Sequence, residues 1–322
     1  MNLYPFKFYP ILKERLWGGT KLSTALGKKT ESDLIGESWE ISGVAGDVSI
    51  VANGVLEGTA LTDLIHRFPE EVLGKSVLER FGKEFPILIK FIDAQKDLSI
   101  QLHPNDELAR KRHDSFGKTE MWYVMDADKG AELIIGFKED ISREKYIESI
   151  RNGTLLDLLN FEDVNEGDTY FINAGTIHAI GAGVLIAEIQ QTSDLTYRVY
   201  DYNRKDAYGN LRELHTELSI DAINYRKQDD FKVKYSKEPN VSNPMVNSTY
   251  FKTNFIPLNK NTKFDVPERD SFTIYMCIDG SVGIENDFGS VFIKKGETVL
   301  VPASSSHILL NTEGVQLLEI TI

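Results

Sequence analysis

Short stretches rich in Val, Ile, Phe, Tyr and Thr dominate this chain, and Gly, Asn and Asp residues separate them. This alternation is typical of β-strands bounded by turns. In the first 240 residues the clearest stretches are 37–42, 85–93, 120–125, 132–137, 184–190 and 196–202. Evenly spaced stretches follow at 250–258, 271–278, 281–285, 290–294, 298–302 and 315–322. The pattern therefore predicts a protein built mainly from strands.

Helical spacing of apolar residues appears only between these stretches. It predicts a helix in 61–81, which Pro69 should divide into two. Shorter helices are predicted after possible N-cap residues, namely Asn105 or Asp106 (to 113), Ser142 (from 143), Thr154 (155–160) and Thr216 (to 224). Because strands dominate and helices only interrupt them, an antiparallel barrel or sandwich is favoured over a wound α/β sheet.

The hydrophobic pattern lapses between Tyr225 and Thr249, where prolines and polar residues gather. A chain of 322 residues is long enough to bury two cores. We therefore expect two domains, a larger one with helical insertions at 1–240 and a small barrel at 241–322.

The two parts share a repeated phrase. Residues 167–178 (GDTYFINAGTIH) align without gaps with 296–307 (GETVLVPASSSH). Each phrase predicts a turn, a strand, a second turn and a histidine that begins the next strand. Both resemble the second sequence motif of cupins, although Asn173 replaces its proline and Ser304 its glycine. The resemblance implies a mainly β fold of two cupin-type jelly-roll barrels.

Charge and cysteine content limit the possible partners. The formal net charge is −13, which speaks against a nucleic-acid or anionic-membrane surface. Cys277 is the only cysteine, so neither an intrachain disulfide nor a thiolate zinc cluster is possible, and a reducing cytoplasm fits best. Pro5, Lys7 and Pro10 interrupt the apolar residues of the first segment, and no run reaches transmembrane length. We expect a cytoplasmic protein without nucleic-acid or membrane partners; the sequence does not indicate its oligomeric state.

Four residues have the chemistry and spacing of a metal site. Gln101 and His103 are two apart in a predicted strand, so their side chains project from the same face. Glu120 begins another predicted strand, and His178 ends the first copy of the repeated phrase. Two imidazoles, one carboxylate and one amide oxygen suit Zn²⁺ best, with Mn²⁺, Fe²⁺ or Co²⁺ as alternatives. We expect one Zn²⁺ per chain in the first barrel.

The other histidines lack such partners. His307 occupies the same place as His178 in the repeated phrase, but the strands before it supply no second ligand. The second barrel is therefore expected to be free of metal. His66, His113 and His215 are expected to be solvated or locally hydrogen-bonded, although His113 lies close to the metal site in the sequence.

Six short phrases, in this order, make the chain resemble the type I mannose-6-phosphate isomerases, in their compact bacterial form. They are RLWGG (15–19), GESWEIS (36–42), QLHP (101–104), GKTEMWY (117–123), AGTIHA (174–179) and QTSDLTYRVYD (191–201). The resemblance implies an aldose–ketose isomerase that interconverts mannose 6-phosphate and fructose 6-phosphate through a metal-assisted enediol. It also implies that the zinc ligands are Gln101, His103, Glu120 and His178.

The resemblance further assigns Arg198, Lys118 and Glu188 to catalysis. The chemistry requires a cation, because negative charge develops on the carbonyl oxygen as a proton moves between C1 and C2. Arg198 offers a donor fork for an oxyanion or a phosphate. Arg204, six residues further on, is a candidate to hold the phosphate, and Ser99 is a hydroxyl candidate for the same task.

Several roles stay open at this point. Lys118 is either a general acid or base or an electrostatic contact. Glu188 faces inward in one strand register and solvent in the other. Three tryptophans and one acid are candidates to line a sugar pocket, namely Trp17, Trp39, Trp122 and Glu40. Aromatic residues in strands can instead simply fill the core.

Two other functions are compatible with a metal-binding barrel. A cupin dioxygenase would need redox-active iron, and both the Gln101 ligand and the lack of a His-x-His pair speak against it. A sugar-binding module without activity, whose metal serves folding, is the second alternative.

Overall fold

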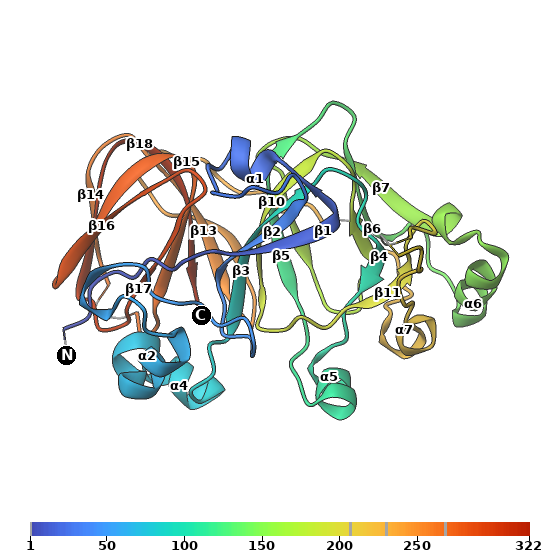
Figure 1. Ribbon diagram of the computed structural model, residues 1–322, viewed down its shortest axis with the longest axis horizontal. Helices are drawn as coiled ribbons and strands as arrows, with labels where there is room; N and C mark the ends of the chain where they lie inside the picture. Colours follow the sequence, from blue (N-terminus) through green and yellow to red (C-terminus); the bar gives the residue numbers. More distant parts are fainter. Residues whose placement is uncertain (1, 206–207, 229–230, 267–268) are drawn as a thin grey trace.

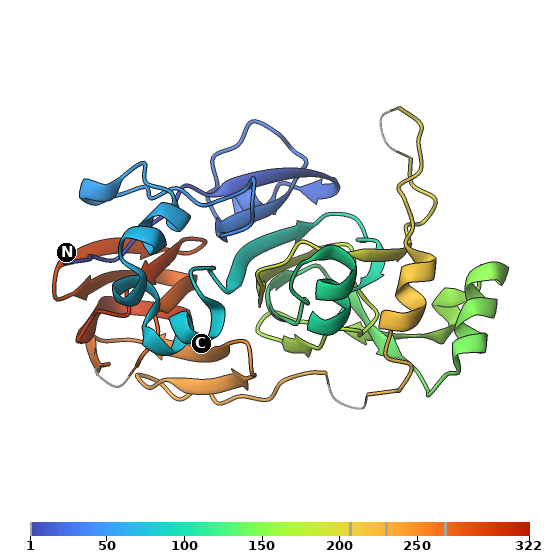
Figure 2. The ribbon, with the colours of Figure 1, turned by 90° about the horizontal axis from the view of Figure 1, so that it is seen from below.

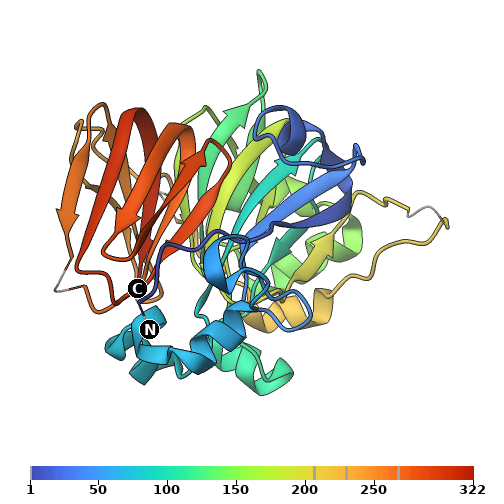
Figure 3. The same cartoon turned by 60° about the vertical axis from the view of Figure 1, so that its left-hand side comes forward.

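The computed structural model describes residues 2–205, 208–228, 231–266 and 269–322. Strands dominate it, so the prediction of a mainly β protein is confirmed (Figure 1). Two groups of strands lie side by side along the long axis of the molecule, and short helices lie at the periphery (Figure 3). None of the helices in these ranges is both long and apolar enough to cross a bilayer.

Two antiparallel sheets form the first barrel. The six-stranded sheet has the order β1 (Ile11–Gly19), β2 (Ile35–Ile41), β3 (Ile87–Ala94), β10 (Val184–Gln191), β5 (Glu120–Ala127) and β8 (Thr169–Ile172). The five-stranded sheet has the order β11 (Tyr197–Tyr200), β4 (Ile100–Leu102), β9 (His178–Ile180), β6 (Glu132–Phe137) and β7 (Leu159–Asp163). Apolar side chains from both sheets share one core between them, which includes Val124, Ile186 and Ile135.

A third antiparallel sheet forms the second barrel. Its strand order is β12 (Asn243–Asn247), β13 (Lys252–Leu258), β18 (His307–Thr321), β15 (Thr273–Asn286) and β16 (Gly289–Lys294), while β14 (Thr262–Asp265) pairs with β18 and β17 (Thr298–Val301) with β15. Tyr275, Val299 and Leu317 belong to the core inside this barrel. Pro244 is tolerated in β12 because that strand lies at the sheet edge.

The six-stranded sheet is buried on both faces. In β10, Ile186 faces the interior of the first barrel, whereas Ala187 and Ile189 belong to a different core. That core also contains Leu318 and Ile320 of β18. Alternation of side chains along a strand explains the division. The central strands therefore read as continuous apolar runs, because one face packs inside the first barrel and the other against the second.

Helices cover the ends and the outer faces. They are α1 (Lys21–Thr24), α2 (Leu61–Arg67), α3 (Pro69–Leu73), α4 (Lys75–Phe81), α5 (Asp106–His113), α6 (Arg143–Asn152) and α7 (Thr216–Ala222), with 3₁₀ turns at Gly54–Leu56 and Leu155–Leu158. Figure 2 shows α6 and α7 at the end of the first barrel that is farther from the second barrel. Side chains of both helices pack against the outer face of the five-stranded sheet.

Some predicted helices differ in detail. Pro69 does begin a new helix, but Gly74, with φ of 88°, adds a second break, so 61–81 contains three helices rather than two. Asn105 and Ser142 cap their helices as predicted. Thr216 is instead the first helical residue, since His215 takes the capping position and the helix ends at Ala222.

The predicted helix at 155–160 is wrong beyond Leu158, where β7 begins. Backbone pairing with β6 outweighs the helical spacing of the leucines there.

The N-terminal part also contacts the second barrel. Phe6 pairs with Leu300, and the backbone of Ala303 donates a hydrogen bond to Val72 O in α3. The proposed division of the chain into 1–240 and 241–322 stays a prediction.

Candidate metal centre and active-site cavity

Strand pairing brings the predicted metal ligands together inside the first barrel. Gln101 lies directly opposite His178 in the β4–β9 ladder. His103 follows the end of β4, and Glu120 begins β5 in the facing sheet. The ligands therefore come from both sheets of the barrel. Figure 1 shows β4 and β5 in the two different sheets of the first barrel.

Three of these side chains converge on one point. The Nε2 atoms of His103 and His178 lie 3.4 and 3.3 Å from the two carboxylate oxygens of Glu120. The nearest ligand atoms of the three residues all lie within 4.8 Å of one another, and all three side chains are buried. Gln101 Nε2 lies 3.5 Å from His178 Nε2. Because an amide can be turned by 180° with little change in shape, either its nitrogen or its oxygen can face this point.

Both imidazoles are oriented for metal binding. His103 Nδ1 donates a hydrogen bond to Leu195 O at 2.7 Å, and His178 Nδ1 donates one to Thr176 O at 2.9 Å. A proton on Nδ1 leaves the Nε2 lone pair free for a metal ion. Burial lowers the pKa of His103 to about 3 and also lowers that of His178, so both rings are neutral at physiological pH.

The carboxylate of Glu120 is ionised despite its burial. Burial alone would raise its pKa, but the positive charge of the neighbouring Lys118 opposes burial, and the pKa lies well below its usual range. Both Glu120 oxygens and His103 Nε2 are buried, and none has a hydrogen-bond partner among the described residues. Buried polar atoms without partners are rare and costly. This donor set therefore fits a divalent cation, which would satisfy these atoms together.

A cavity of about 500 Å³ adjoins this centre. It contains most of the catalytic and substrate-binding residues predicted from the sequence. Those that line it are Trp17, Ser99, Gln101, Lys118, Glu188 and Arg198. Trp122 and Trp39 also line it, so three of the four residues considered for a sugar pocket are present.

Glu40 is the exception, because it does not line the cavity. In β2, Glu37 and Trp39 face the cavity, and alternation turns Glu40 to the opposite face. There its Oε1 lies 2.6 Å from Nζ of the buried Lys28. Of the two alternatives left open for this group, the pocket interpretation is wrong for Glu40, and Glu37 lines the cavity instead.

Lys118 lies between the cavity and the metal ligands. Its Nζ is 3.5 Å from Glu120 Oε2, and its side chain is buried. The backbone nitrogen of Lys118 donates to Pro104 O, which ties the loop before β5 to the end of β4. The lysine is thus held beside the cluster rather than in solvent.

Glu188 faces the cavity. Of the two registers considered for its strand, the structure therefore has the one in which this side chain points inward. It is paired with Lys90 of β3 on one side and Trp122 of β5 on the other. Trp122 Nε1 donates to Glu188 Oε1 at 3.0 Å, and Lys90 Nζ lies 3.1 Å from Oε2. Burial alone would lower the pKa of Lys90, but Glu188 and Glu37 outweigh it and raise that pKa.

Sequence analysis missed Lys90. The signal was a single lysine in the apolar run ILIKFIDA, which is otherwise typical of a strand buried on both faces.

Arg198 lies at one side of the cavity, next to Ser99. Its Nε donates to Ser99 Oγ at 3.3 Å, and its Nη1 donates to Glu213 O at 2.9 Å. Burial lowers the pKa of this guanidinium, although it stays charged. In the described part of the chain, no carboxylate oxygen lies within 4 Å of it. Its charge is thus available to a ligand.

Arg204 does not line the cavity. Its guanidinium pairs with Asp201 and donates to Asp97 O. Arg212 lies on the cavity wall instead. Sequence analysis missed Arg212 because its segment has no strand or helix periodicity. Arg15, Glu37 and Asp194 also line the cavity without having been singled out as site residues.

The remaining histidines have local partners or are exposed. His113 contacts Tyr197 Oη at 2.8 Å, and His215 Nδ1 accepts a hydrogen bond from Arg198 N at 3.2 Å. His307 Nδ1 lies 2.9 Å from Asp287 Oδ1 near the surface, and His66 is exposed. The expectation of locally bonded or solvated histidines is confirmed.

Comparison with known proteins agrees with this geometry. The family model "Phosphomannose isomerase type I, catalytic domain" matches residues 6–139, and "Mannose-6-phosphate isomerase, cupin domain" matches residues 242–318. Mannose-6-phosphate isomerase ManA of Bacillus subtilis (strain 168) is 35% identical over 305 residues, which cover 94% of each protein. The chain belongs to the mannose-6-phosphate isomerase family. Its members are enzymes, so the isomerase prediction is favoured over a dioxygenase or an inactive sugar-binding module.

Two further relatives support membership of the isomerase family. Mannose-6-phosphate isomerase of Streptococcus mutans serotype c is 42% identical over 218 residues, 67% of this chain and 66% of that protein. The crystal structure of the mannose 6-phosphate isomerase from Bacillus subtilis superimposes with a TM-score of 0.89 at 31% identity, covering 99% of this chain and 100% of that one. The predicted cupin fold is thereby confirmed.

Proposed function

We propose that this protein interconverts mannose 6-phosphate and fructose 6-phosphate by moving a proton between C1 and C2 of the open-chain sugar. The observation that carries the proposal is the buried His103–Glu120–His178 cluster beside a polar cavity. The chain that holds it aligns along nearly its whole length with proteins named for this activity.

We assign one Zn²⁺ per chain to this cluster, with His103, Glu120, His178 and Gln101 as its ligands. Neutral imidazoles with a single carboxylate suit Zn²⁺ better than Mg²⁺ or Ca²⁺, which prefer oxygen ligands. When bound, the metal supplies a Lewis acid that stabilises negative charge on the substrate oxygens next to the reacting carbons.

The cavity walls bind and orient the sugar. Trp17 and Trp122 provide apolar faces, while Ser99 offers a hydroxyl. Arg198 has no carboxylate partner among the described residues, so its charge and the N–H groups that do not bond to Ser99 and Glu213 can bind an oxyanion or the phosphate. Glu37 and Arg15 pair with each other and form part of the same wall.

Proton transfer needs a group that can gain and lose a proton beside C1 and C2. Glu188 Oε1 accepts a hydrogen bond from Trp122, and Oε2 lies 3.1 Å from the charged Nζ of Lys90. Lys118 Nζ has one close charged partner, at 3.5 Å, and lines the cavity. We therefore assign proton transfer to Lys118, and to Glu188 the positioning of Trp122 and Lys90 in the cavity wall.

A coupled assay for fructose 6-phosphate tests the activity. We expect turnover of mannose 6-phosphate that disappears after chelation and returns with added Zn²⁺. The control is a second sample of the same protein, taken through the same steps without chelator. Metal-loaded, folded protein without turnover in either direction would exclude the proposed reaction.

A further inference from the structure

The charges along the cavity wall are not balanced. Its described lining contains six basic residues and four acidic ones. Three of the basic residues form ion pairs with acids of the same wall, namely Lys13 with Asp47, Arg15 with Glu37 and Lys90 with Glu188. A fourth, Lys118, lies next to the metal-binding carboxylate. Arg198 and Arg212 are the lining residues whose positive charge remains, and no ion pair among the described residues joins the fourth acid, Asp194, to either of them.

Among the described residues, Arg212 has a single carboxylate partner, which is distant and shared with Arg204. Its Nη1 lies 3.5 Å from Asp201 Oδ1, which also pairs with Arg204. One aspartate thus faces two arginines, and Arg198 lies beside them without a carboxylate of its own in the described part of the chain. The side chain of Arg212 is 27% exposed, so it reaches both the cavity and solvent.

Like charges surround Arg212 from both sheets. Burial lowers its pKa first, and Arg198, Arg204 and Arg15 lower it further, whereas Asp201 raises it. Arg15 belongs to β1 of the six-stranded sheet, so Arg212 faces a cation from the opposite wall. Keeping several guanidinium groups together costs electrostatic energy unless an anion offsets them.

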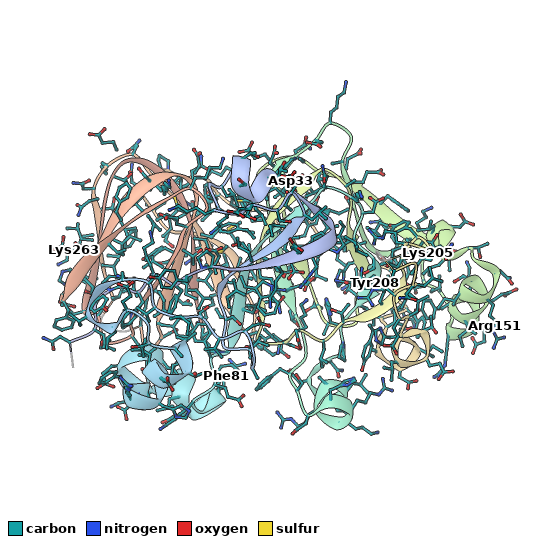
Figure 4. All side chains as sticks on the ribbon, in the orientation of Figure 1. Asp33, Phe81, Arg151, Lys205, Tyr208 and Lys263 are labelled. Atoms are coloured by element: carbon teal, nitrogen blue, oxygen red, sulfur yellow. The ribbon has the colours of Figure 1, made fainter. Side chains whose placement is uncertain are left out.

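Backbone hydrogen bonds of the neighbouring residues hold Arg212 in the cavity wall. The residues on either side of 206–207, between β11 and α7, extend away from the first barrel (Figure 2), and Lys205 and Tyr208 on this excursion are labelled in Figure 4. Beyond it the chain returns to β11. Glu213 O accepts from Arg198 Nη1 at 2.9 Å, and His215 N donates to Arg198 O at 2.7 Å. These bonds on the C-terminal side of Arg212 hold it next to Arg198.

We propose that Arg212 binds the phosphate group of the substrate together with Arg198, and that it selects sugar phosphates over free sugars. This inference rests on the proposed function, because it places the same substrate in the same cavity. A phosphate carries close to two negative charges and accepts paired hydrogen bonds from guanidinium groups. It matches the two arginines whose charge the wall leaves unbalanced.

Arg212→Gln is the direct test, since it removes the charge and the guanidinium donors but keeps a polar side chain. We expect the KM for mannose 6-phosphate to rise about 10- to 100-fold, with kcat changed by less than about threefold, because charged hydrogen bonds to the phosphate are lost in ground and transition states alike. Inorganic phosphate, as a competitive inhibitor, should lose affinity by a similar factor. The matched control is Arg226→Gln, whose side chain is exposed and paired with Asp140 at the surface.

Arg212→Lys keeps a charge but loses the donor fork, so its phosphate affinity should fall between those of wild type and Arg212→Gln. If the thermal unfolding curve shows that Arg212→Gln does not fold, Arg212→Lys tests whether Arg212 binds phosphate. Unchanged inhibition by phosphate in Arg212→Lys would then overturn the proposal.

Phosphate binding also separates this inference from the proposed reaction. Calorimetric titration of the zinc-loaded protein with inorganic phosphate needs no turnover. Weaker binding by Arg212→Gln than by wild type supports the inference even if neither sugar phosphate is converted. Equal binding by the two proteins overturns it even if wild type is a good isomerase.

Discussion

Lys90 on β3 and Glu188 on β10 face each other across adjacent strands, and their Nζ and Oε2 atoms lie 3.1 Å apart in the cavity wall. Both side chains are at least 94% shielded from solvent. Removing one partner would leave the other charge buried and uncompensated. The pair is therefore a structural requirement of the wall as well as part of its chemistry.

From this pair we expect Lys90→Met to lower the free energy of unfolding by about 3 kcal/mol, because Glu188 then remains buried without a counter-charge. Urea unfolding measures the effect. In the double variant with Glu188→Gln the loss should be smaller than the sum of the two single losses. Additive losses would show that the two side chains do not interact.

Lys118→Met should abolish most of the activity without loss of the metal. Removing a group that transfers a proton lowers kcat by about 10²- to 10⁴-fold. Zinc analysis should still find one ion per chain, because Nζ of Lys118 is not a ligand. Lys129→Met, at an exposed position, is the matched control and should keep the wild-type kcat. A normal kcat in Lys118→Met would show that another residue transfers the proton.

Zinc should stabilise the folded protein measurably. A ligand that binds only the folded state at about 1,000 times its Kd adds about 4 kcal/mol. We expect Zn²⁺ to raise the Tm of the metal-free protein and His178→Asn to remove most of that increase. The control is His113→Asn, which also replaces a histidine. His113 is exposed and hydrogen-bonded to Tyr197, so Zn²⁺ should raise the Tm of this variant as much as that of wild type.

The metal centre was predictable because its signals are local. The spacing of Gln101 and His103 places both on one face of a strand, and the repeated phrase marks the turn before His178. Glu120 was predicted as the carboxylate that begins another strand, although its convergence with the histidines depends on pairing between distant strands. The sequence therefore predicted which residues come together, whereas the bound Zn²⁺ and its ligand set stay a prediction.

The rest of the cavity depends on contacts that the sequence does not encode locally. Lys90 lies in a strand that is buried on both faces, and such a strand carries no alternation to indicate a polar side. Arg212 follows an irregular segment, so only the folded chain shows that it returns to Arg198. The leucines of 155–160 have helical spacing, yet pairing with β6 draws the last of them into β7.

Glu37 provides a pH dependence with a defined direction. Burial alone would raise its pKa, but Lys90 and Arg15 outweigh burial and hold it at about 2, below the usual 4.5. A carboxyl group with a lowered folded-state pKa stabilises the protein above the unfolded pKa, and this contribution is lost as pH falls from 4.5 to 2. We expect the free energy of unfolding of wild type to fall across this window and that of Glu37→Gln to fall less. Parallel curves from urea unfolding would contradict this.

Asp270 joins a helix of the N-terminal part to the second barrel. Its carboxylate accepts hydrogen bonds from the backbone nitrogens of Lys75 and Ser76 at 2.6 and 2.8 Å, in the first turn of α4. Replacing a residue that caps a helix in this way costs about 1 kcal/mol. We expect Asp270→Ala to lower the free energy of unfolding by about that amount, measured by urea unfolding. Asp265→Ala is the control, because its surface ion pair with Lys263 should contribute less than about 0.5 kcal/mol. Equal effects of the two variants would mean that the carboxylate does not hold α4 to the second barrel.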